Sequence, residues 1–497
     1  MPPRRETTGR QRAGRDGRLP AASTVSTLPV TNPRTGEVDY EVPVHDRQAI
    51  EVAAAALHAK QPGWEAAGLE ARSEALLKWE RAMEADADDI VEALCADTGR
   101  RSMAQVEASS VRGWIRYWTA HAPDVVQPGA GASRLAPSVH FRHQYRPYPL
   151  VGVISPWNVP LILGLIDAVP ALLAGCAVLL KPSEVTPRFV EPLRRTIEAV
   201  PELAAVLRIV TGGPDTGEAL IDNVDAVCFT GSVPTGRKVA AQAAANFIPA
   251  FLELGGKDPA IVLPSADLDN AASAILRSAA GLTGQACQSL ERIYVHREVF
   301  DDFLRRLVEK AEATSLSWPE PHEGVLGPFI FPPQAAKVQA QLDDAVAHGA
   351  TIHCGGLEEH GGQWCRPLVL TGVNHDMDLM REETFGPVMP LMPFDTVDEA
   401  VALANDSRYG LSGAVFAGTA EEGEAVARRL LGGAISVNDA SLTANVHDVE
   451  KHAFRQSGMG GSRMGDEGLL RFFRKQAILV QTAPAASLDV MAERSPS

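Results

Sequence analysis

The sequence lacks the cysteine patterns that mark metal centres and disulfide frameworks. Only six of its 497 residues are cysteine, and none form a C-x-x-C pair or a Cys/His cluster with zinc-ligand spacing. We therefore expect no metal and no structural disulfide, which favours a reducing compartment, the cytoplasm. The six cysteines are Cys95, Cys176, Cys228, Cys287, Cys354 and Cys365.

Positive charge is also scarce. Lysine and arginine number 46 against 62 aspartates and glutamates, for a formal net charge of -16. Such a surface repels nucleic-acid phosphates and anionic lipid headgroups, so we expect neither nucleic acid nor a membrane as a partner. The longest mainly apolar stretch, residues 159–180, contains Asp167 and Pro170. Because a carboxylate is costly in lipid, this stretch predicts a buried helix and then a strand at 177–180, not a membrane span.

The N-terminus lacks the apolar run of a secretory signal. Residues 1–27 are instead rich in arginine, and we predict that they form a disordered extension. An organelle transit peptide is also arginine-rich, but Glu6, Asp16 and the scarcity of serine weigh against that alternative.

The remaining chain is long enough for two or three domains. Apolar periodicity predicts helices over residues 46–60 and 69–97, after an extended segment near 31–40. Residues 125–148 are rich in proline, glycine and β-forming residues, which predicts an extended arm or hairpin.

From residue 150 short β-forming runs alternate with amphipathic helices, which predicts an α/β fold with a parallel, doubly wound sheet. Ligands of such sheets bind at the carboxyl ends of the strands. The predicted strands span residues 150–154, 177–180, 207–210, 226–229 and 251–254. A second α/β domain is expected over 255–433, with helices near 270–282, 299–313, 334–348 and 396–405.

The usual dinucleotide fingerprint, G-x-G-x-x-G, is absent. Residues 229–236, F-T-G-S-V-P-T-G, instead place glycines where a strand ends and a helix begins. That turn offers backbone N–H groups to a phosphate, although an ordinary strand-to-helix turn explains it equally well. Lys181 and Glu184 follow the second strand, either as a solvated pair or at a ribose site. A carboxylate there accepts ribose hydroxyls and repels a 2′-phosphate, which favours NAD and leaves NADP as the alternative.

Three further segments carry groups suited to covalent catalysis. Glu253 ends an apolar strand before two glycines and is a candidate general base. Cys287 lies at a turn before a strand predicted at 292–296, where backbone dipoles and a cofactor cation can activate a thiol. Asn158, in P-W-N-V-P, has an amide that can donate to an oxyanion. A thiol, a carboxylate and an amide at strand ends indicate one shared site.

These motifs occur in the order found in the aldehyde dehydrogenase superfamily, and the sequence resembles that superfamily from about residue 31 to residue 481. The matching motifs are P-W-N-x-P at 156–160, K-P-S-E at 181–184, F-T-G-S at 229–232, E-L-G-G-K at 253–257, G-Q-x-C at 284–287 and E-E-x-F-G-P at 382–387.

The resemblance implies a doubly wound parallel-sheet cofactor domain, an α/β catalytic domain and a small β oligomerisation arm. The implied divisions are a NAD-binding domain over 28–124 and 149–253, a catalytic domain over 254–435, a return segment and substrate mouth over 436–469, an oligomerisation arm over 125–148 and 470–485, and a flexible tail over 486–497. The arm, with a strand near 477–481, implies a homodimer or homotetramer.

The resemblance also implies the reaction, which is NAD-dependent oxidation of a small-molecule aldehyde to a carboxylic acid. Cys287 attacks the aldehyde, and the Asn158 amide and the Cys287 backbone N–H hold the oxyanion. After hydride passes to the nicotinamide, Glu253 activates the water that hydrolyses the thioester.

For the cofactor, the resemblance implies Lys181 and Glu184 at the adenosine ribose, Ser232 at the pyrophosphate, and Glu383 and Phe385 at the nicotinamide. The other implied cofactor-binding residues are Ser155, Trp157, Ser183, Gly213, Gly217, Phe229, Thr230, Gly231 and Leu254.

Three places depart from the family pattern or leave their role open. Asp167 stands where many members carry a lysine, either as neutral packing at a helix surface or as a charge that disfavours anionic aldehydes. The usual S-G-x-G-R-E is altered in residues 457–465, with its acid missing or displaced to Asp466 or Glu467. Residues 438–452 contribute to the substrate mouth in relatives and here form either part of that mouth or a solvated loop. They include His447, Asp448, Glu450, Lys451 and His452.

Two alternative functions stay open. A CoA-acylating semialdehyde dehydrogenase uses a thiol in place of water, and Glu253 argues against it because that route needs no water-activating base. A catalytically silent scaffold is disfavoured because all three catalytic residue types are retained. The aldehyde itself is left open. Trp114, Tyr117 and Trp118 recur on one predicted helix, either as a tunnel wall or as core.

Overall fold

The computed structural model describes residues 26–360 and 362–493. The disordered extension predicted at 1–27 therefore lies outside the described residues, except for its last two. The described chain opens with an antiparallel hairpin of β1 (Thr27–Thr31) and β2 (Val38–Pro43).

The single extended segment predicted near 31–40 is wrong, because the hairpin turn falls inside it. Gly36 adopts a φ of 74°, which glycine reaches without strain, and its N–H donates to Asn32 O at 2.8 Å. The two strands lie on either side of this turn.

Four helices follow the hairpin and share one hydrophobic core. They are α1 (Arg47–Ala66), α2 (Gly68–Ala85), α3 (Ala87–Thr98) and α4 (Arg101–Val125). The continuous helix predicted over 69–97 is wrong, because Asp86 leaves the helical region between α2 and α3, at φ -100° and ψ 15°. Apolar periodicity hid this break, since Met83 before it and Ile90 after it are buried in the same core.

The predicted doubly wound sheet is present, with strand order β17-β9-β8-β5-β6-β7. Its five main strands run parallel, and β17 (Gly458–Met459) joins antiparallel beside β9. The main strands are β5 (Leu150–Ile154), β6 (Ala177–Lys181), β7 (Leu207–Ile209), β8 (Ala226–Thr230) and β9 (Ala250–Glu253). The helices between them are α5 (Pro160–Ala174), α6 (Val190–Glu198), α7 (Pro201–Ala204), α8 (Pro214–Ile221) and α9 (Val233–Ala245).

The strand order creates a switch point between β5 and β8. The chain moves from β5 outward to β6 and β7, then returns to form β8 on the other side of β5. The connections leave in opposite directions there, so a crevice opens at the carboxyl ends of these two strands. The turns after β5 and β8 carry P-W-N-V-P and F-T-G-S, so both motifs reach this crevice.

Residues 159–180 form α5 followed by β6, as predicted. The helix ends at Gly175, whose φ of 107° is left-handed, and nearly all of its side chains are buried in the core. Among the described residues, no helix combines the length and the apolar character needed to cross a membrane.

A second, mostly parallel sheet has the order β12-β13-β14-β11-β10-β15-β16, in which only β12 and β13 pair antiparallel. Its strands are β10 (Asp258–Val262), β11 (Leu290–His296), β12 (Thr351–His360), β13 (Gly362–Thr371), β14 (Val388–Phe394), β15 (Ser412–Phe416) and β16 (Ala434–Val437). Its helices are α10 (Leu268–Ala280), α11 (Phe300–Glu312), α12 (Pro332–Ala347), α13 (Asp378–Arg381), α14 (Val397–Asn405) and α15 (Ala420–Ala427). The four helices predicted for this region correspond to α10, α11, α12 and α14.

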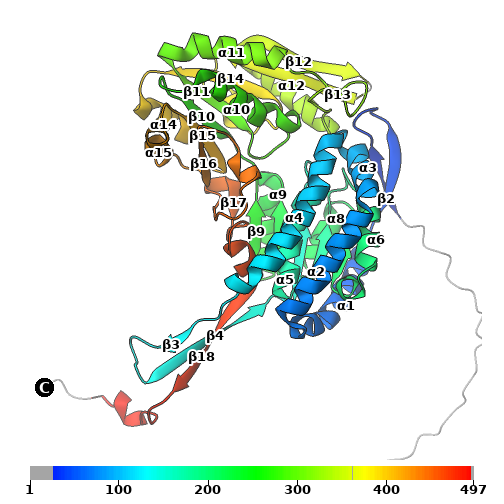
Figure 1. Ribbon diagram of the computed structural model, residues 1–497, viewed down its shortest axis with the longest axis vertical. Helices are drawn as coiled ribbons and strands as arrows, with labels where there is room; N and C mark the ends of the chain where they lie inside the picture. Colours follow the sequence, from blue (N-terminus) through cyan, green and yellow to red (C-terminus); the bar gives the residue numbers. More distant parts are fainter. Residues whose placement is uncertain (1–25, 361, 494–497) are drawn as a thin grey trace, which may run out of the picture.

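The two sheets have separate hydrophobic cores and form two lobes (Figure 1). A three-stranded antiparallel arm projects from the lower lobe, with strand order β18-β4-β3. Its strands are β3 (Ala130–Ala132), β4 (Val139–Pro147) and β18 (Phe473–Gln481). The hairpin predicted at 125–148 thus pairs with a strand from near the C-terminus. The exact domain boundaries stay a prediction.

Candidate active site

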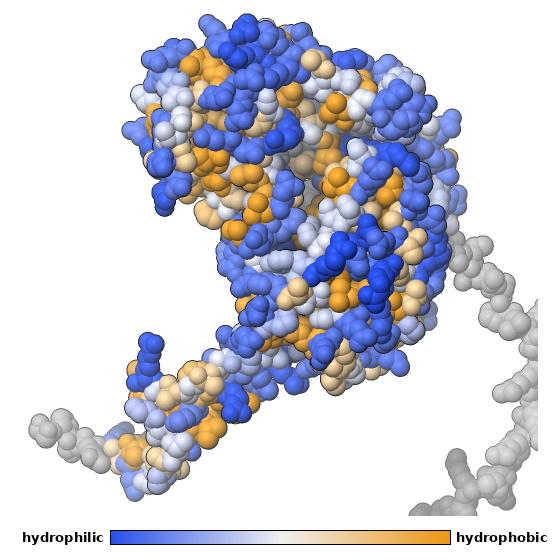
Figure 2. Space-filling view, viewed as in Figure 1, coloured by the Kyte–Doolittle hydropathy of each residue, from blue (hydrophilic) through white to orange (hydrophobic). Residues whose placement is uncertain are grey.

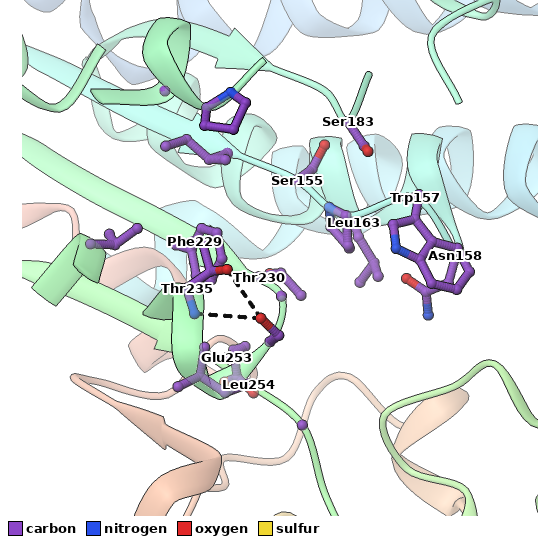
Figure 3. Close-up of a pocket in the computed structure, with 18 of the residues that line it drawn as sticks. Ser155, Trp157, Asn158, Leu163, Ser183, Phe229, Thr230, Thr235, Glu253 and Leu254 are labelled. Carbon is purple, nitrogen blue, oxygen red and sulfur yellow. Dashed lines mark hydrogen bonds between the residues drawn. The ribbon is translucent and has the colours of Figure 1, made fainter. Parts of the chain in front are cut away.

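A cavity of about 520 Å³ lies at the carboxyl ends of β5, β6, β8 and β9 and is closed by residues from the second lobe. All three predicted catalytic residues, Cys287, Glu253 and Asn158, line it. Figure 3 shows Trp157 and Asn158, from the turn after β5, on a different side of this cavity from Glu253 and Leu254 at the end of β9. The predicted cofactor residues that line it are Ser155, Trp157, Lys181, Ser183, Glu184, Gly217, Phe229, Thr230, Gly231, Ser232, Leu254, Glu383 and Phe385.

Gly213 is the one predicted cofactor residue that does not line the cavity. It precedes α8, and its neighbour Pro214 lines the cavity in its place. A side chain at Gly213 would point toward Leu28 of the N-terminal hairpin.

Several lining residues were missed because they lie on helices. Lys238 and Gln242 come from α9, and Phe331, Gln334 and Lys337 come from the start of α12 in the other lobe. Helical periodicity predicts which side of a helix is apolar, but it does not say which polar side chain faces a ligand. No local motif marks these positions.

The turn after β8 has the form of an anion-binding helix start. Ser232 caps α9 and its Oγ accepts from the Thr235 N–H at 3.4 Å, as the dashed lines in Figure 3 mark. Of the first three positions of α9, Pro234 has no N–H and the Thr235 N–H is taken by Ser232, which leaves the Val233 N–H and the positive end of the helix dipole for a ligand. Gly231 is required because a Cβ there would lie 2.6 Å from the Phe229 ring.

Lys181 and Glu184 form an ion pair at the other end of the cavity. The Lys181 Nζ lies 3.3 Å from the Glu184 Oε2, with the lysine buried and the glutamate partly exposed. Burial lowers the pKa of Lys181, and the carboxylate of Glu184 opposes that change. A polar ligand bound at this end of the cavity would contact the partly exposed Glu184 carboxylate.

Cys287 sits on a tightly packed loop between α10 and β11. Leu282 and Thr283, early in this loop, adopt left-handed φ values of 55° and 57°. Gly284 is also left-handed, and a Cβ there would overlap the backbone of Gly386. The Gln285 side chain donates to Pro328 O at 3.3 Å and accepts from the Ile330 N–H at 2.9 Å. These contacts fix the loop that presents the thiol.

The Cys287 thiol is only partly exposed to the cavity. Burial raises its pKa to about 12, and a nearby lysine, Lys451, opposes this rise. The charges of three carboxyl groups add to this rise in the pKa: Glu253, Glu383 and Asp258.

Asn158 reaches the same loop from the other lobe. Its side chain is buried, and its Nδ2 donates to Gln285 O, two residues before Cys287, at 2.9 Å. An amide nitrogen carries two N–H groups, so one remains for a ligand. The turn is held from behind by Glu107 on α4, whose Oε2 accepts from the N–H groups of Leu161 and Ile162 at 2.9 and 3.1 Å.

Glu253 ends β9, and its carboxylate meets Lys451. The Lys451 Nζ lies 3.7 Å from the Glu253 Oε2, and the lysine side chain is only 4% exposed. For Lys451 the solvated-loop interpretation of residues 438–452 is therefore wrong. Asp448, Glu450 and His452 are exposed, and His447 is half-buried against the Trp114 ring, at 4.7 Å between centroids.

Glu383 and Phe385 lie on a loop held by a buried ion pair. Lys257 Nζ contacts Glu291 Oε2 at 2.8 Å, and the two carboxylate oxygens of Glu291 accept from the N–H groups of Thr384 and Phe385. Phe385 has a left-handed φ of 57° and packs edge-to-face on Trp157 at 5.4 Å. Burial raises the pKa of Glu383 to about 7.

The surface-packing interpretation of Asp167 is wrong, and the partners of its carboxylate argue against the second interpretation, a charge that disfavours anionic aldehydes. Asp167 is 1% exposed, so it is not surface packing. Its carboxylate pairs with Arg463, at 2.9 Å, and with Arg471, so it presents no net negative charge to a substrate. Burial opposes ionisation, but the two guanidinium groups outweigh it and hold the pKa of Asp167 below its usual value. The altered segment 457–465 supplies one of these arginines, so two departures from the family pattern form one ion cluster.

The displaced acids take other partners. Asp466 pairs with His121 on α4, and Glu467 pairs with His452, both at 2.9 Å.

Comparison with known proteins agrees with this geometry. The model of the aldehyde dehydrogenase family matches residues 20–478. A putative NADP-dependent succinate-semialdehyde dehydrogenase of Mycolicibacterium smegmatis is 34% identical over 93% of this chain and 90% of its own length. A 3,6-anhydro-alpha-L-galactose dehydrogenase of Streptomyces coelicolor is also 34% identical, over 93% of this chain and 94% of its own.

Solved structures show the same likeness. A putative aldehyde dehydrogenase from Anabaena variabilis superposes with a TM-score of 0.91 and 51% identity, over 93% of this chain and 99% of its own. A betaine aldehyde dehydrogenase from Staphylococcus aureus in complex with NAD+ gives a TM-score of 0.87 and 28% identity, over 93% of each chain. With a family model spanning nearly the whole chain and relatives above 30% identity along it, this protein belongs to the aldehyde dehydrogenase family and is an oxidoreductase that converts aldehydes to acids.

Proposed function

We propose that the protein is a non-acylating, NAD-dependent aldehyde dehydrogenase that works through a thioester on Cys287. The observation that carries this proposal is the convergence of Cys287, Asn158 and Glu253 on one cavity with the Lys181–Glu184 pair. The three groups come from a loop of the second lobe, the turn after β5 and the end of β9.

In the first half of the reaction the Cys287 thiolate attacks the aldehyde carbon and forms a thiohemiacetal. Its oxyanion accepts from the free N–H of Asn158 Nδ2 and from the Cys287 backbone N–H, which are oriented before the charge develops. The chemistry that a bound nicotinamide supplies is acceptance of a hydride from this carbon. A thioester on Cys287 is left.

In the second half Glu253 takes a proton from a water molecule as that water attacks the thioester. The C–S bond breaks, the carboxylic acid leaves, and Cys287 is released as a thiolate. A base that activates water is of no use to an acylating enzyme, whose acceptor is already a thiol, so Glu253 favours the hydrolytic route.

The cavity fits a dinucleotide along its length. The Val233 N–H and the positive end of the α9 dipole suit a pyrophosphate, and Glu383 and Phe385 line the same cavity as Cys287, where a nicotinamide is needed. We assign NAD over NADP because Glu184 would repel a 2′-phosphate. Relatives of both kinds exist, one named for NADP and one bound to NAD+.

We also propose that the arm assembles the chain into a homodimer or homotetramer. Apolar side chains gather on it (Figure 2), and Leu479 and Val480 are 67% and 53% exposed. We further assign the enzyme to the cytoplasm, because its thiols have no disulfide-like spacing.

The experiment is an assay of NADH or NADPH formation by purified protein over aliphatic, aromatic, semialdehyde and sugar-derived aldehydes. The wild type is compared with Cys287→Ala and Glu253→Gln, without and with CoA. The proposal predicts turnover that needs no CoA, prefers NAD and is lost in Cys287→Ala. Activity only with CoA, or activity that survives Cys287→Ala, would overturn it.

A further inference from the structure

Lys451 is a buried cation at the active site that belongs to none of the motifs found in the sequence. It lies after β16, among exposed charged residues, yet its own side chain is 4% exposed. Its nearest charged group is Glu253, with 3.7 Å between Nζ and Oε2. Burying an ammonium is costly unless it is paired, so the contact with Glu253 accounts for its position.

Backbone hydrogen bonds hold the segment around Lys451 against the strand that carries Glu253. The Lys451 N–H donates to Ser462 Oγ at 3.1 Å. Seven residues after Lys451 the chain forms β17, in which Gly458 pairs opposite Glu253. Ser457 O accepts from the Leu254 N–H at 2.8 Å, next to that pair. The segment that follows Lys451 is therefore hydrogen-bonded to the strand that carries Glu253, which keeps the two residues close.

The ammonium of Lys451 also affects the charge balance around Cys287. Glu253 and Glu383 line the same cavity as Cys287, and together with Asp258 they raise the pKa of the thiol, whereas the Lys451 ammonium, 3.7 Å from Glu253, opposes that rise. Arg463, which also lies near Glu253, is already engaged by Asp167. A thiolate formed beside these carboxyl groups meets repulsion that Lys451 offsets.

We propose that Lys451 is a positioning residue for both halves of the reaction: its ammonium orients the Glu253 carboxylate and offsets the negative charge beside Cys287. This inference rests on the proposed function, in which Cys287 is the nucleophile and Glu253 the base. A different role, anchoring the carboxylate of an anionic aldehyde, is disfavoured because the ammonium is buried and already paired.

The test reads the thiol directly, without cofactor or turnover. The full chain is treated with iodoacetamide between pH 6.5 and 9.5, and carbamidomethylation of the Cys287 peptide is followed by mass spectrometry. Lys451→Met keeps the length and removes the charge, and Lys451→Arg keeps the charge. Lys78→Met removes a surface lysine that pairs with Glu74 and Glu202.

We expect Lys451→Met to slow alkylation about tenfold or more at each pH, the effect of roughly one unit in the thiol pKa. Lys451→Arg should recover most of the rate, and Lys78→Met should match the wild type. Equal rates in Lys451→Met and the wild type would overturn the proposal.

Lys451→Met alone leaves the Glu253 carboxylate unpaired and could therefore disturb folding. The same substitution is for this reason also made in the Glu253→Gln variant. In Glu253→Gln that carboxylate is absent, so Lys451→Met added to Glu253→Gln isolates the effect of the ammonium on Cys287. The double variant should still be alkylated several-fold more slowly than Glu253→Gln alone. Equal rates in this pair would also overturn the proposal.

Steady-state kinetics separate this inference from its alternative and from the proposed function. Lys451→Met should lower kcat for neutral and carboxylated aldehydes alike. A rise in KM confined to carboxylated aldehydes, with unchanged alkylation, would contradict positioning and indicate a substrate anchor. If Cys287→Ala keeps its aldehyde oxidation, the proposed function fails whatever the alkylation rates are.

Discussion

At the scale of single residues, the chemistry depends on groups that the backbone holds before substrate arrives. The Asn158 amide donates to Gln285 O, and the turn that carries Asn158 is hydrogen-bonded to Glu107. The Glu253 carboxylate contacts the Lys451 ammonium. Such preorganisation is where electrostatic catalysis gains its advantage over water.

The first prediction concerns the oxyanion. Asn158→Ala should lower kcat by 10²–10³-fold, or about 3 kcal/mol in the transition state, because one of two oxyanion donors is lost. Steady-state assays with saturating aldehyde and cofactor measure this. Asn223→Ala is the matched control, since Asn223 is not among the cavity-lining residues and its side-chain amide donates to Ala219 O on α8. A kcat for Asn158→Ala within about threefold of the control would remove Asn158 from the oxyanion site.

The second prediction concerns pH and cofactor affinity. Burial raises the pKa of Glu383 to about 7, so this group is mostly ionised at pH 8 and mostly protonated at pH 6. If the carboxylate accepts the ribose hydroxyls, the Kd for NAD should rise about tenfold from pH 8 to pH 6, in proportion to the lost ionised fraction. Fluorescence titration measures the Kd. Glu383→Gln should bind with little pH dependence, and a Kd that falls on acidification would contradict the assignment.

The residues of the site were predictable to the extent that local motifs mark them. Cys287, Asn158 and Glu253 each lie in a short motif that indicates a catalytic role. For Glu253 that motif is an apolar strand followed by two glycines. Asp258 is among the groups that raise the pKa of the thiol, and a Cβ on Gly256 would lie 2.6 Å from Cys287 O, so that loop tolerates no side chain there. Lys451 was predicted only as one member of residues 438–452, either at the substrate mouth or in a solvated loop, because its adjacent residues are polar and the pairing of β17 with β9, which brings it to Glu253, leaves no local signal.

At the scale of elements, α5 links the oxyanion turn to the C-terminal segment. Asp167, in the middle of α5, pairs with Arg463 and Arg471, and Arg463 also donates to Thr230 at the end of β8. The cluster fastens the return segment to the sheet. Both departures are visible in the sequence but their connection is not, because the partners lie 296 and 304 residues apart.

The third prediction concerns the stability of this cluster. Asp167→Asn should destabilise the protein at pH 7 by about 3–5 kcal/mol, because two buried guanidinium groups lose their counter-charge. The pKa of Asp167 is lowered on folding, so its contribution is present above the ordinary aspartate range and is lost as pH falls through the folded-state value. Chemical denaturation should therefore show a constant difference between wild type and variant from pH 7 down to the ordinary aspartate range, and a shrinking difference only at lower pH.

Asp302→Asn is the matched control for that measurement. Asp302 is exposed on α11 and pairs with Arg305 and Arg306, and pairs of this kind contribute less than about 1 kcal/mol. A difference between Asp167→Asn and the wild type that grew on acidification would contradict the cluster's assigned role.

At the scale of the whole molecule, the two lobes and the cavity between them follow from alternation of strands and helices. That pattern predicted the parallel sheets because βαβ units close only in a few ways. It did not predict β17 or the break at Asp86, since a two-residue strand and a kink between buried helices leave no periodic signal.

The fourth prediction concerns assembly. Leu479→Asp on β18 should shift the protein to a smaller species in sedimentation velocity, because a charge cannot be buried against a second copy without a partner. Val52→Asp on α1, also an exposed apolar position at 61%, is the control and should leave the mass unchanged. Identical sedimentation of both variants and the wild type would remove the arm from the interface.

The most direct test of the account is to trap the intermediate. Glu253→Gln is mixed with an aldehyde and NAD, and intact-protein and peptide mass spectrometry are combined with the NADH trace. The account predicts a burst of about one NADH per site, little further turnover, and one acyl group on Cys287. Steady turnover of this variant at the wild-type rate, or an acyl group on any residue other than Cys287, would contradict it.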